Sequence, residues 1–424
     1  MKRQAFPSDD DGDTVHNNNN NNNNNKSSKN DMAVVMDGSQ GEGGGQILRN
    51  SVAYASILQR PLRIHSIRAK RRNPGLQAQH CAAIGLAAEL GEGVLEGATL
   101  KNTEITYHPP STTDDPKEEE ERTVEGIVNT AGSICLLLQA ALPCALLGSN
   151  QTTKLVLKGG TNAKMAPQYD YWERIFLPTF QQWLGGADKV PIEATVLKRG
   201  YYPKGGGHIE VTVPSLLPQL PIPPLQLTDR GTVKHIQIRS FHAGKLPRHL
   251  ATKMAKSAQQ LLEQTFEKDS IQIDLEIVTE PNAVGSGLGI LIVATTTTGC
   301  RLGGSALCDP KQKADEAGRV AAQELVDTWN DGGCVDEWMQ DQLILFMAFA
   351  KGTSTMLTGS LTLHTQTAIE VAQQMVPGVK FDVQRLEEPA AASAPKSDGG
   401  GYGSDGRISG KHLITCHGIG YTGN

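Results

Sequence analysis

The sequence predicts a protein of mixed α/β (α+β) class, in which strand–helix units repeat and a smaller α/β domain is inserted. Short β-branched runs alternate with longer helical patterns along most of the chain. A helical pattern at 127–147 precedes a strand at 153–160, and a helix at 340–350 precedes a strand at 360–364. Because the same order of elements recurs, we expect an internally repeated architecture.

The remaining elements follow from their own patterns. The apolar run at 32–36 predicts a buried strand, and 46–58 predicts a helix with one apolar face. A strand at 62–67 and a helix at 79–90 come next. A late helix at 368–376 carries a continuous apolar stripe, which indicates packing against a sheet.

Breaks in composition divide the chain into parts. Residues 1–30 combine acidic residues with a poly-Asn run that cannot form a core, so we expect a disordered extension. The segment 225–330 has strands and helices of its own, which predicts a small inserted α/β domain. It interrupts a large domain formed by 31–224 plus 331–386, and the Pro-, Gly- and Ser-rich start of 387–424 predicts a flexible tail.

Composition limits the class of protein. A net charge of −5 excludes a protein that coats nucleic acid through bulk positive charge, so RNA binding would need a local basic patch. The 7 cysteines form no CxxC pair and are typical of small core residues in a reducing compartment. No apolar run is long enough to cross a bilayer and no signal peptide stands out, so we expect an intracellular, soluble protein with no membrane partner.

A glycine-rich loop at 37–49, DGSQGEGGGQILR, lies between a predicted strand and a predicted helix. Glycines there let the backbone approach a ligand closely, although neither the Walker A loop nor the dinucleotide fingerprint is matched. Glu42 could hold a divalent metal beside a triphosphate. A tight strand–helix turn with an exposed glutamate explains the same pattern.

A basic cluster follows in IRAKRRNPGLQAQH, residues 67–80. Arg68 and Arg71 carry the planar donors that suit phosphate recognition, and they lie at a strand end, where α/β folds place ligands. A solvated charged face is the alternative for the cluster, and a structural histidine is the alternative for His80.

The segment LTLHTQTAIE, residues 361–370, places His364 between a predicted strand and a predicted helix. Thr367 and Glu370 form a capping-box pattern, so the positive end of the helix would face the histidine. That field favours a neutral imidazole beside a phosphoryl group, as nucleophilic catalysis requires. A structural role remains the alternative for a single histidine.

Together these segments resemble the RNA 3′-terminal phosphate cyclase family. The matching stretches keep the family's order over roughly 31–385 and are DGSQGEGGGQILR, IRAKRRNPGLQAQH, AGSICLLLQAALP, KGGTNAKMAP, RGYYPKGGGHIEV, DQLILFMAFA and LTLHTQTAIEVAQQM. The resemblance implies repeated βαβαββ-type units related to enolpyruvyl transferases, with a smaller inserted α/β domain.

The resemblance also implies a reaction. A histidine would attack the α-phosphorus of ATP to give a covalent AMP adduct, AMP would pass to an RNA 3′-terminal phosphate, and the vicinal 2′-OH would close a 2′,3′-cyclic phosphate. It implies ATP and Mg²⁺ or Mn²⁺ as cofactors, RNA with a 3′-terminal phosphate as partner, no obligate protein partner and a nuclear location.

The family's functional positions fall on residues of this sequence. The nucleophile falls on His364 and the metal-binding glutamate on Glu42. The phosphate- or RNA-binding positions are Arg49, Arg68 and Arg71, and the nucleotide-binding positions are Gln139, Pro167, Trp338, Asp341 and Gln342. Trp338 departs from the family, since a tyrosine facing the adenine is expected there.

Two alternative functions are weighed against this one. A non-catalytic, cyclase-like ribosome-assembly factor would share the fold but lack the histidine, whereas His364 and Glu42 are both present. An enolpyruvyl-type transferase would need no adenylate, so labelling with ATP separates the two.

Overall fold

The computed structural model describes residues 33–111, 121–217, 221–266, 271–309, 311–386 and 406–423. These belong to one compact unit, Ala33–Asn424. The predicted extension over 1–30 and the part of the predicted tail from 387 to 405 lie outside the described residues.

The first repeating unit runs from residue 34 to residue 108. Its elements are β1 (Val34–Asp37), α1 (Gly45–Leu58), β2 (Leu62–His65), α2 (Ala78–Leu90), β3 (Val94–Glu96) and β4 (Ile105–His108). The sheet has the order β1-β2-β4-β3; β1 pairs parallel with β2, and β4 pairs antiparallel with both β2 and β3.

The second unit repeats this plan. Its elements are β5 (Glu121–Ile127), α3 (Ile134–Leu147), β6 (Thr152–Gly159), α4 (Tyr169–Tyr171), the π-helix η1 (Trp172–Phe176), α5 (Leu177–Trp183), β7 (Glu193–Gly200) and β8 (Gly207–Val213). The strand order is β5-β6-β8-β7, with the same parallel and antiparallel pairs as in the first unit.

The third unit uses the plan again, but the chain leaves it after the first strand. Its elements are β9 (Gln226–Leu227), α8 (Glu337–Phe349), β15 (Lys351–Thr358), α9 (Leu363–Met375), β16 (Lys380–Arg385) and β17 (His412–Ile419). The order is β9-β15-β17-β16, with β9 and β15 parallel and β17 antiparallel to its neighbours. The predicted repetition of βαβαββ-type units is therefore confirmed; their relation to enolpyruvyl transferases stays a prediction.

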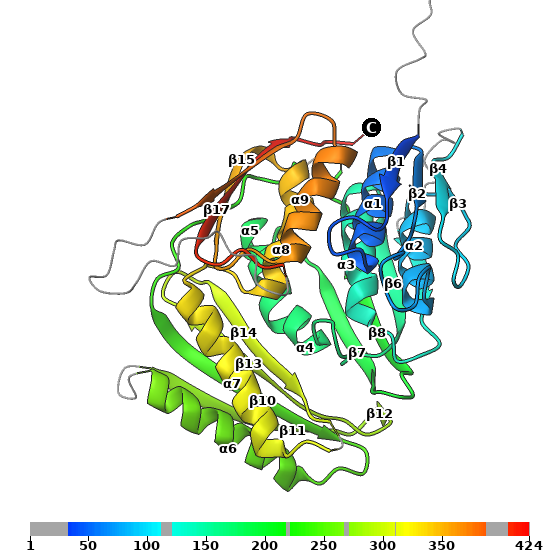
Figure 1. Cartoon of the computed structure of the whole chain (residues 1–424). Coiled ribbons are helices and arrows are strands. Elements are labelled where there is room, and N and C mark those ends of the chain that lie inside the picture. The colour runs from blue at the N-terminus through cyan, green and yellow to red at the C-terminus, as the bar shows by residue number, and fades with distance from the viewer. Residues whose placement is uncertain are drawn as a thin grey trace, which may run out of the picture. The chain divides into compact units, whose positions relative to one another are not determined.

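A separate sheet is formed by the chain between β9 and α8. This part of the chain contains β10 (Val233–Ala243), α6 (Arg248–Thr265), β11 (Gln272–Glu280), β12 (Ala283–Val284), β13 (Leu288–Thr296), β14 (Arg301–Leu307) and α7 (Ala314–Asp331). Of these, β12 pairs with β7 and extends the sheet of the second unit. Strands β11-β10-β13-β14 form the sheet, and Figure 1 shows α6 and α7 side by side against it. Apolar residues of α6, α7 and this sheet form their own core. We propose that this segment is the inserted domain, although β9, inside the predicted 225–330, belongs to the third unit.

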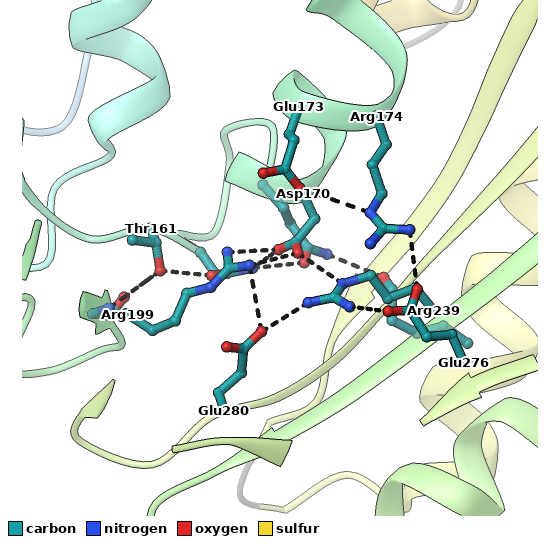
Figure 2. Close-up of polar contacts among 12 residues, drawn as sticks. Thr161, Asp170, Glu173, Arg174, Arg199, Arg239, Glu276 and Glu280 are labelled. Atoms are coloured by element: carbon teal, nitrogen blue, oxygen red, sulfur yellow. Dashed lines mark hydrogen bonds and ion pairs between the residues drawn. The ribbon is translucent and has the colours of Figure 1, made fainter. Parts of the chain in front are cut away.

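The inserted sheet is joined to the second unit by a buried ionic network (Figure 2). Asp170 of α4 is fully buried and accepts hydrogen bonds from Arg199 of β7 at 2.9 and 3.0 Å and from Arg239 Nε of β10 at 3.0 Å. Glu280 of β11 contacts both arginines, at 3.3 and 2.9 Å. Because a buried charge is stable only when it is paired, these contacts fix β10 against β7 and α4.

Three predictions about secondary structure are wrong. The helix predicted over 127–147 begins only at Ile134, because 121–127 is strand β5. The strand predicted at 360–364 does not form: the strand is β15, which ends at Thr358, and α9 begins at Leu363.

The third concerns the tail predicted over 387–424. Its described part, 406–423, contains β17, which lies between β15 and β16 and has alternate residues buried. A strand flanked on both sides by hydrogen-bonded neighbours is part of the fold, so the prediction of a flexible tail fails for this part.

Candidate active site

His364 is the second residue of α9, and its position is fixed by the cap of that helix. Thr362 is the N-cap, and its hydroxyl accepts a hydrogen bond from the Thr365 backbone N–H at 3.1 Å. Thr367 therefore lies inside the helix, and the prediction that Thr367 and Glu370 form its capping box is wrong. Its hydroxyl accepts instead from the Glu42 N–H at 2.9 Å, which ties the glycine-rich loop to α9.

The glycine-rich loop packs too closely for side chains at two of its positions. Gly41 has a φ of +55°, and a Cβ there would lie 2.3 Å from the Thr367 hydroxyl oxygen. A Cβ on Gly45 would lie 2.7 Å from His80 Nε2 and 2.9 Å from Arg49 Nη1. These glycines let the loop and the start of α1 approach three polar side chains, so the sequence pattern has a direct geometric cause.

A chain of side-chain hydrogen bonds leads from α8 through α1 to His364. Gln46 Nε2 donates to Asp341 Oδ2 at 2.5 Å, and Gln46 Oε1 lies 3.1 Å from His364 Nδ1. Because a carbonyl oxygen can only accept, Nδ1 of His364 carries the proton and Nε2 is the unprotonated nitrogen. Gln46 thus sets the tautomer of the histidine.

The surroundings of His364 keep its imidazole neutral. Partial burial lowers the pKa of His364 below its usual value; Glu42 opposes this, and Arg49 and Arg71 add to it. The residue still has an exposed face. An unprotonated, accessible Nε2 is the state that a nucleophile requires.

Asp341 lies in an environment that disfavours its charge. Desolvation raises the pKa of Asp341 to about 7, while the nearby guanidinium of Arg49 favours the ionised form. The carboxyl of Asp341 therefore gains or loses its proton near neutral pH. The orientation that the Gln46 amide prefers changes with this protonation.

Glu42 is nearly buried, and both of its carboxylate oxygens have partners. Oε1 accepts from the Gln46 N–H at 3.1 Å, and Oε2 pairs with Arg71 Nη2 at 2.8 Å. The Glu42 side chain is 7% exposed, against 48% for Arg71. The arginine is thus the solvent-facing partner and can turn toward an anion.

Arg49 and Arg68 are both close enough to His80 for their charges to act on it. Arg49 is 7% exposed, donates to Gln139 Oε1 at 3.1 Å, and has a buried Nε with no hydrogen-bond partner. Burial, followed by the charges of Arg49 and Arg68, lowers the pKa of His80 to about 3. His80 Nδ1 accepts from the Gln77 N–H at 3.1 Å, so its role as part of a helix cap is confirmed.

A small pocket opens beside this chain of hydrogen bonds. Its polar wall includes Gln46, Gln139, Asp341 and Gln342, and its apolar wall comes from α3, α8 and η1. A concave site with an apolar wall and a few convergent polar groups is the usual form of a small-molecule site.

The predicted site residues divide into two groups. Contacts or charge interactions connect His364 with a set from four distant segments: Glu42, Arg49, Arg68, Arg71, Gln139 and Asp341. Pro167 and Trp338 do not line the pocket; Pro167 is buried, and Trp338 Nε1 donates to Glu324 Oε1 at 3.2 Å. Gln46 was not singled out from the sequence, because nothing local indicates its link to His364.

A metal site is not complete in the protein alone. In the described ranges, no group of three or more His, Cys, Asp or Glu residues could hold a metal ion. Glu42 is a single carboxylate beside cationic side chains, which suits an ion that takes its other ligands from phosphate oxygens and water.

The fold and the site define an α/β protein of three repeated units with a candidate catalytic histidine, and comparison with known proteins gives the family. Residues 40–383 match the family model described as RNA 3′-terminal phosphate cyclase. The chain belongs to the RNA 3′-terminal phosphate cyclase family.

Similar proteins from distant organisms carry the same family name. The chain is 36% identical over 387 residues to a probable RNA 3′-terminal phosphate cyclase of Dictyostelium discoideum, covering 91% of this chain and 83% of the relative. It is 35% identical to an RNA 3′-terminal phosphate cyclase of Desulfurococcus amylolyticus, covering 91% and 98%. With one of Drosophila melanogaster it shares 34% identity, covering 91% and 96%.

Among the described residues, no helix is long and apolar enough to span a membrane.

Proposed function

We propose that this protein converts an RNA 3′-terminal phosphate to a 2′,3′-cyclic phosphate at the expense of ATP, with His364 as the covalent carrier of AMP. The observation that carries the proposal is the chain from Asp341 through Gln46 to His364 Nδ1. It leaves Nε2 unprotonated on the exposed histidine at the start of a helix, where a phosphoryl group is favoured.

In the first step His364 Nε2 attacks the α-phosphorus of ATP, a P–N bond forms, and the P–O bond to pyrophosphate breaks. The Nδ1 proton stays on the ring and donates to Gln46 Oε1, so the positive charge of the adduct faces the Gln46–Asp341 chain. In the second step an oxygen of the RNA 3′-phosphate attacks the same phosphorus, and the P–N bond breaks. In the third, the 2′-OH attacks the terminal phosphate, AMP leaves, and the hydroxyl proton is released to solvent.

Different residues of the site would bind the phosphates and the nucleoside. We propose that Arg49, Arg68 and Arg71 bind phosphates, and that Gln139, Asp341 and Gln342 bind the nucleoside in the pocket that they line. The unpartnered, buried Nε of Arg49 supports this role, because an unpaired buried donor is costly without an acceptor. Adenine packing by Pro167 and Trp338 would require the Trp338 side chain to turn from Glu324.

Glu42 would hold Mg²⁺ or Mn²⁺ together with phosphate oxygens. Such an ion offsets negative charge as pyrophosphate leaves. Since both oxygens of Glu42 have partners, Arg71 would exchange its contact with Glu42 for one with a phosphate. We also propose a nuclear location, which is supported by the family resemblance alone.

The test is labelling with ATP that carries the label at its α-phosphate, in Mg²⁺ or Mn²⁺, followed by denaturing electrophoresis. We expect an acid-labile, alkali-stable adduct in the wild type and in His417→Ala, a variant of an exposed histidine on β17, and none in His364→Ala. RNA with a 3′-phosphate should discharge the label. If the folded protein binds ATP but is never labelled, the result would favour the alternative of a non-catalytic ribosome-assembly factor.

A further inference from the structure

A second cavity lies away from the ATP pocket, where the second unit meets the inserted sheet. It has a volume of about 440 Å³ and is lined by Tyr201 and Tyr202 from the β7–β8 connection. Leucines of β13, β14 and the start of α6 form its apolar wall. The motifs KGGTNAKMAP and RGYYPKGGG both contribute to it.

The rim of this cavity is basic in a protein that is acidic overall. Lys164, Lys253 and Lys313 line it together with one carboxylate, Asp309. Lys164 pairs with Asp309 and Lys253 pairs with Asp315, but the two lysine side chains remain 62% and 58% exposed. Three cations against these two carboxylates attract a polyanion although the net charge of the chain is −5.

Apolar surface is exposed at the same rim. Tyr202 is 79% exposed, although a tyrosine ring gains free energy from burial. Met165, next to Lys164, is 92% exposed and has a φ of +59°, a left-handed conformation that costs free energy for a non-glycine residue. Cations beside an exposed aromatic ring are the combination that binds single-stranded nucleic acid, through phosphates and stacked bases.

We propose that this cavity binds single-stranded RNA, the segment that precedes the 3′-terminal phosphate of the substrate. This rests on the proposed function, since it concerns the RNA that the site at His364 would act on. A cavity of about 440 Å³ lies within the usual range of a ligand site and accommodates a nucleotide of the strand.

The two sites are within reach of one RNA strand. Lys164 lines the RNA cavity and Trp172 lines the ATP pocket. Eight residues separate them in the chain, so their Cα atoms are at most about 28 Å apart. A short single strand spans that distance, whereas a dinucleotide ending in a phosphate would occupy the catalytic site alone.

The experiment compares two lysines of the same helix. Lys253 and Lys256 are both exposed on α6, but only Lys253 lines the cavity. For a long single-stranded RNA with a 3′-phosphate, Lys253→Ala should weaken binding about fivefold at 0.1 M salt, because each single-strand phosphate contact contributes ~0.7 to the slope of log K against log salt. Tyr202→Ala should weaken it about fivefold or more through lost stacking. Lys256→Ala should bind as the wild type does.

The activity readout separates this inference from the proposed function. Self-adenylation without RNA should be unchanged in Lys253→Ala and Tyr202→Ala, as should discharge by a dinucleotide with a 3′-phosphate, while KM for the long RNA rises. If wild-type protein forms no adenylate, the proposed function fails, and the binding comparison still reports on the cavity. The proposal that this cavity binds RNA would be overturned by either of two results. One is an equal loss of RNA affinity in Lys253→Ala and Lys256→Ala, and the other is wild-type affinity in Lys253→Ala and Tyr202→Ala.

Discussion

Asp341→Asn tests whether the hydrogen-bond chain controls the tautomer of His364. The carboxylate of Asp341 accepts from Gln46 Nε2 at 2.5 Å and so forces Gln46 Oε1 toward His364. An asparagine can also donate, which allows the Gln46 amide to turn and present its NH₂ group to Nδ1. The His364 proton would then move to Nε2, and the nucleophile would be lost.

The size of the effect follows from one hydrogen bond. A hydrogen bond to a charged group contributes about 1.5–3 kcal/mol. If the Gln46 amide no longer prefers to present Oε1 to His364, the fraction of the reactive tautomer falls about 10- to 100-fold. We expect a fall of that size in the single-turnover rate of self-adenylation at saturating ATP, which separates the chemical step from weaker ATP binding.

The pH dependence gives a second readout. Protonated Asp341 can donate as asparagine does, so the wild-type adenylation rate should rise with pH through about 7, the pKa of Asp341. Burial lowers the pKa of His364 below its usual value, so the protonation of His364 lies at lower pH than this step. Asp341→Asn should lack the step near pH 7. A variant within threefold of the wild-type rate, or one that keeps this step, would refute the control of the tautomer by Asp341.

Further predictions concern the framework of the site. Asp170→Asn removes the buried partner of two arginines and should lower the free energy of unfolding by about 3–5 kcal/mol in urea titrations, whereas Asp274→Asn, at an exposed pair, should leave it close to the wild-type value. Gly41→Ala places a Cβ 2.3 Å from Thr367 Oγ1, so adenylation should fall at least tenfold with the fold kept, as circular dichroism would show. Arg71→Lys keeps the charge but loses the guanidinium geometry and should raise KM for ATP severalfold, in steady-state assays, while an unchanged KM would argue against a phosphate contact.

The repeated fold could be predicted from the sequence because its elements carry clear periodic patterns. The boundaries around His364 could not, because the alternating residues of SLTLH fit a strand as well as the first turn of a helix. The side-chain cap of Thr362, three residues before Thr365, decides the outcome in favour of the helix.

The chemistry-bearing residues could be located by resemblance, but their connections could not. Gln46 lies 318 positions from His364 and 295 from Asp341, so only the packing of α1 against α8 and α9 shows that it joins them. The last strand was missed because the glycine- and serine-rich segment before it suggested a tail, although the alternation in HLITCHGI is a strand pattern.

The placement of β17 has a consequence for biosynthesis. The first two units are complete in the chain by residues 108 and 213, but the third sheet has a gap between β15 and β16 until residues 412–419 have been made. Nascent chains thus carry two finished sheets and one open one, whose exposed strand edges invite pairing with other chains. The third sheet therefore closes only after residues 412–419 have left the ribosome, and truncation before residue 412 would leave the facing edges of β15 and β16 open and yield a product prone to aggregation.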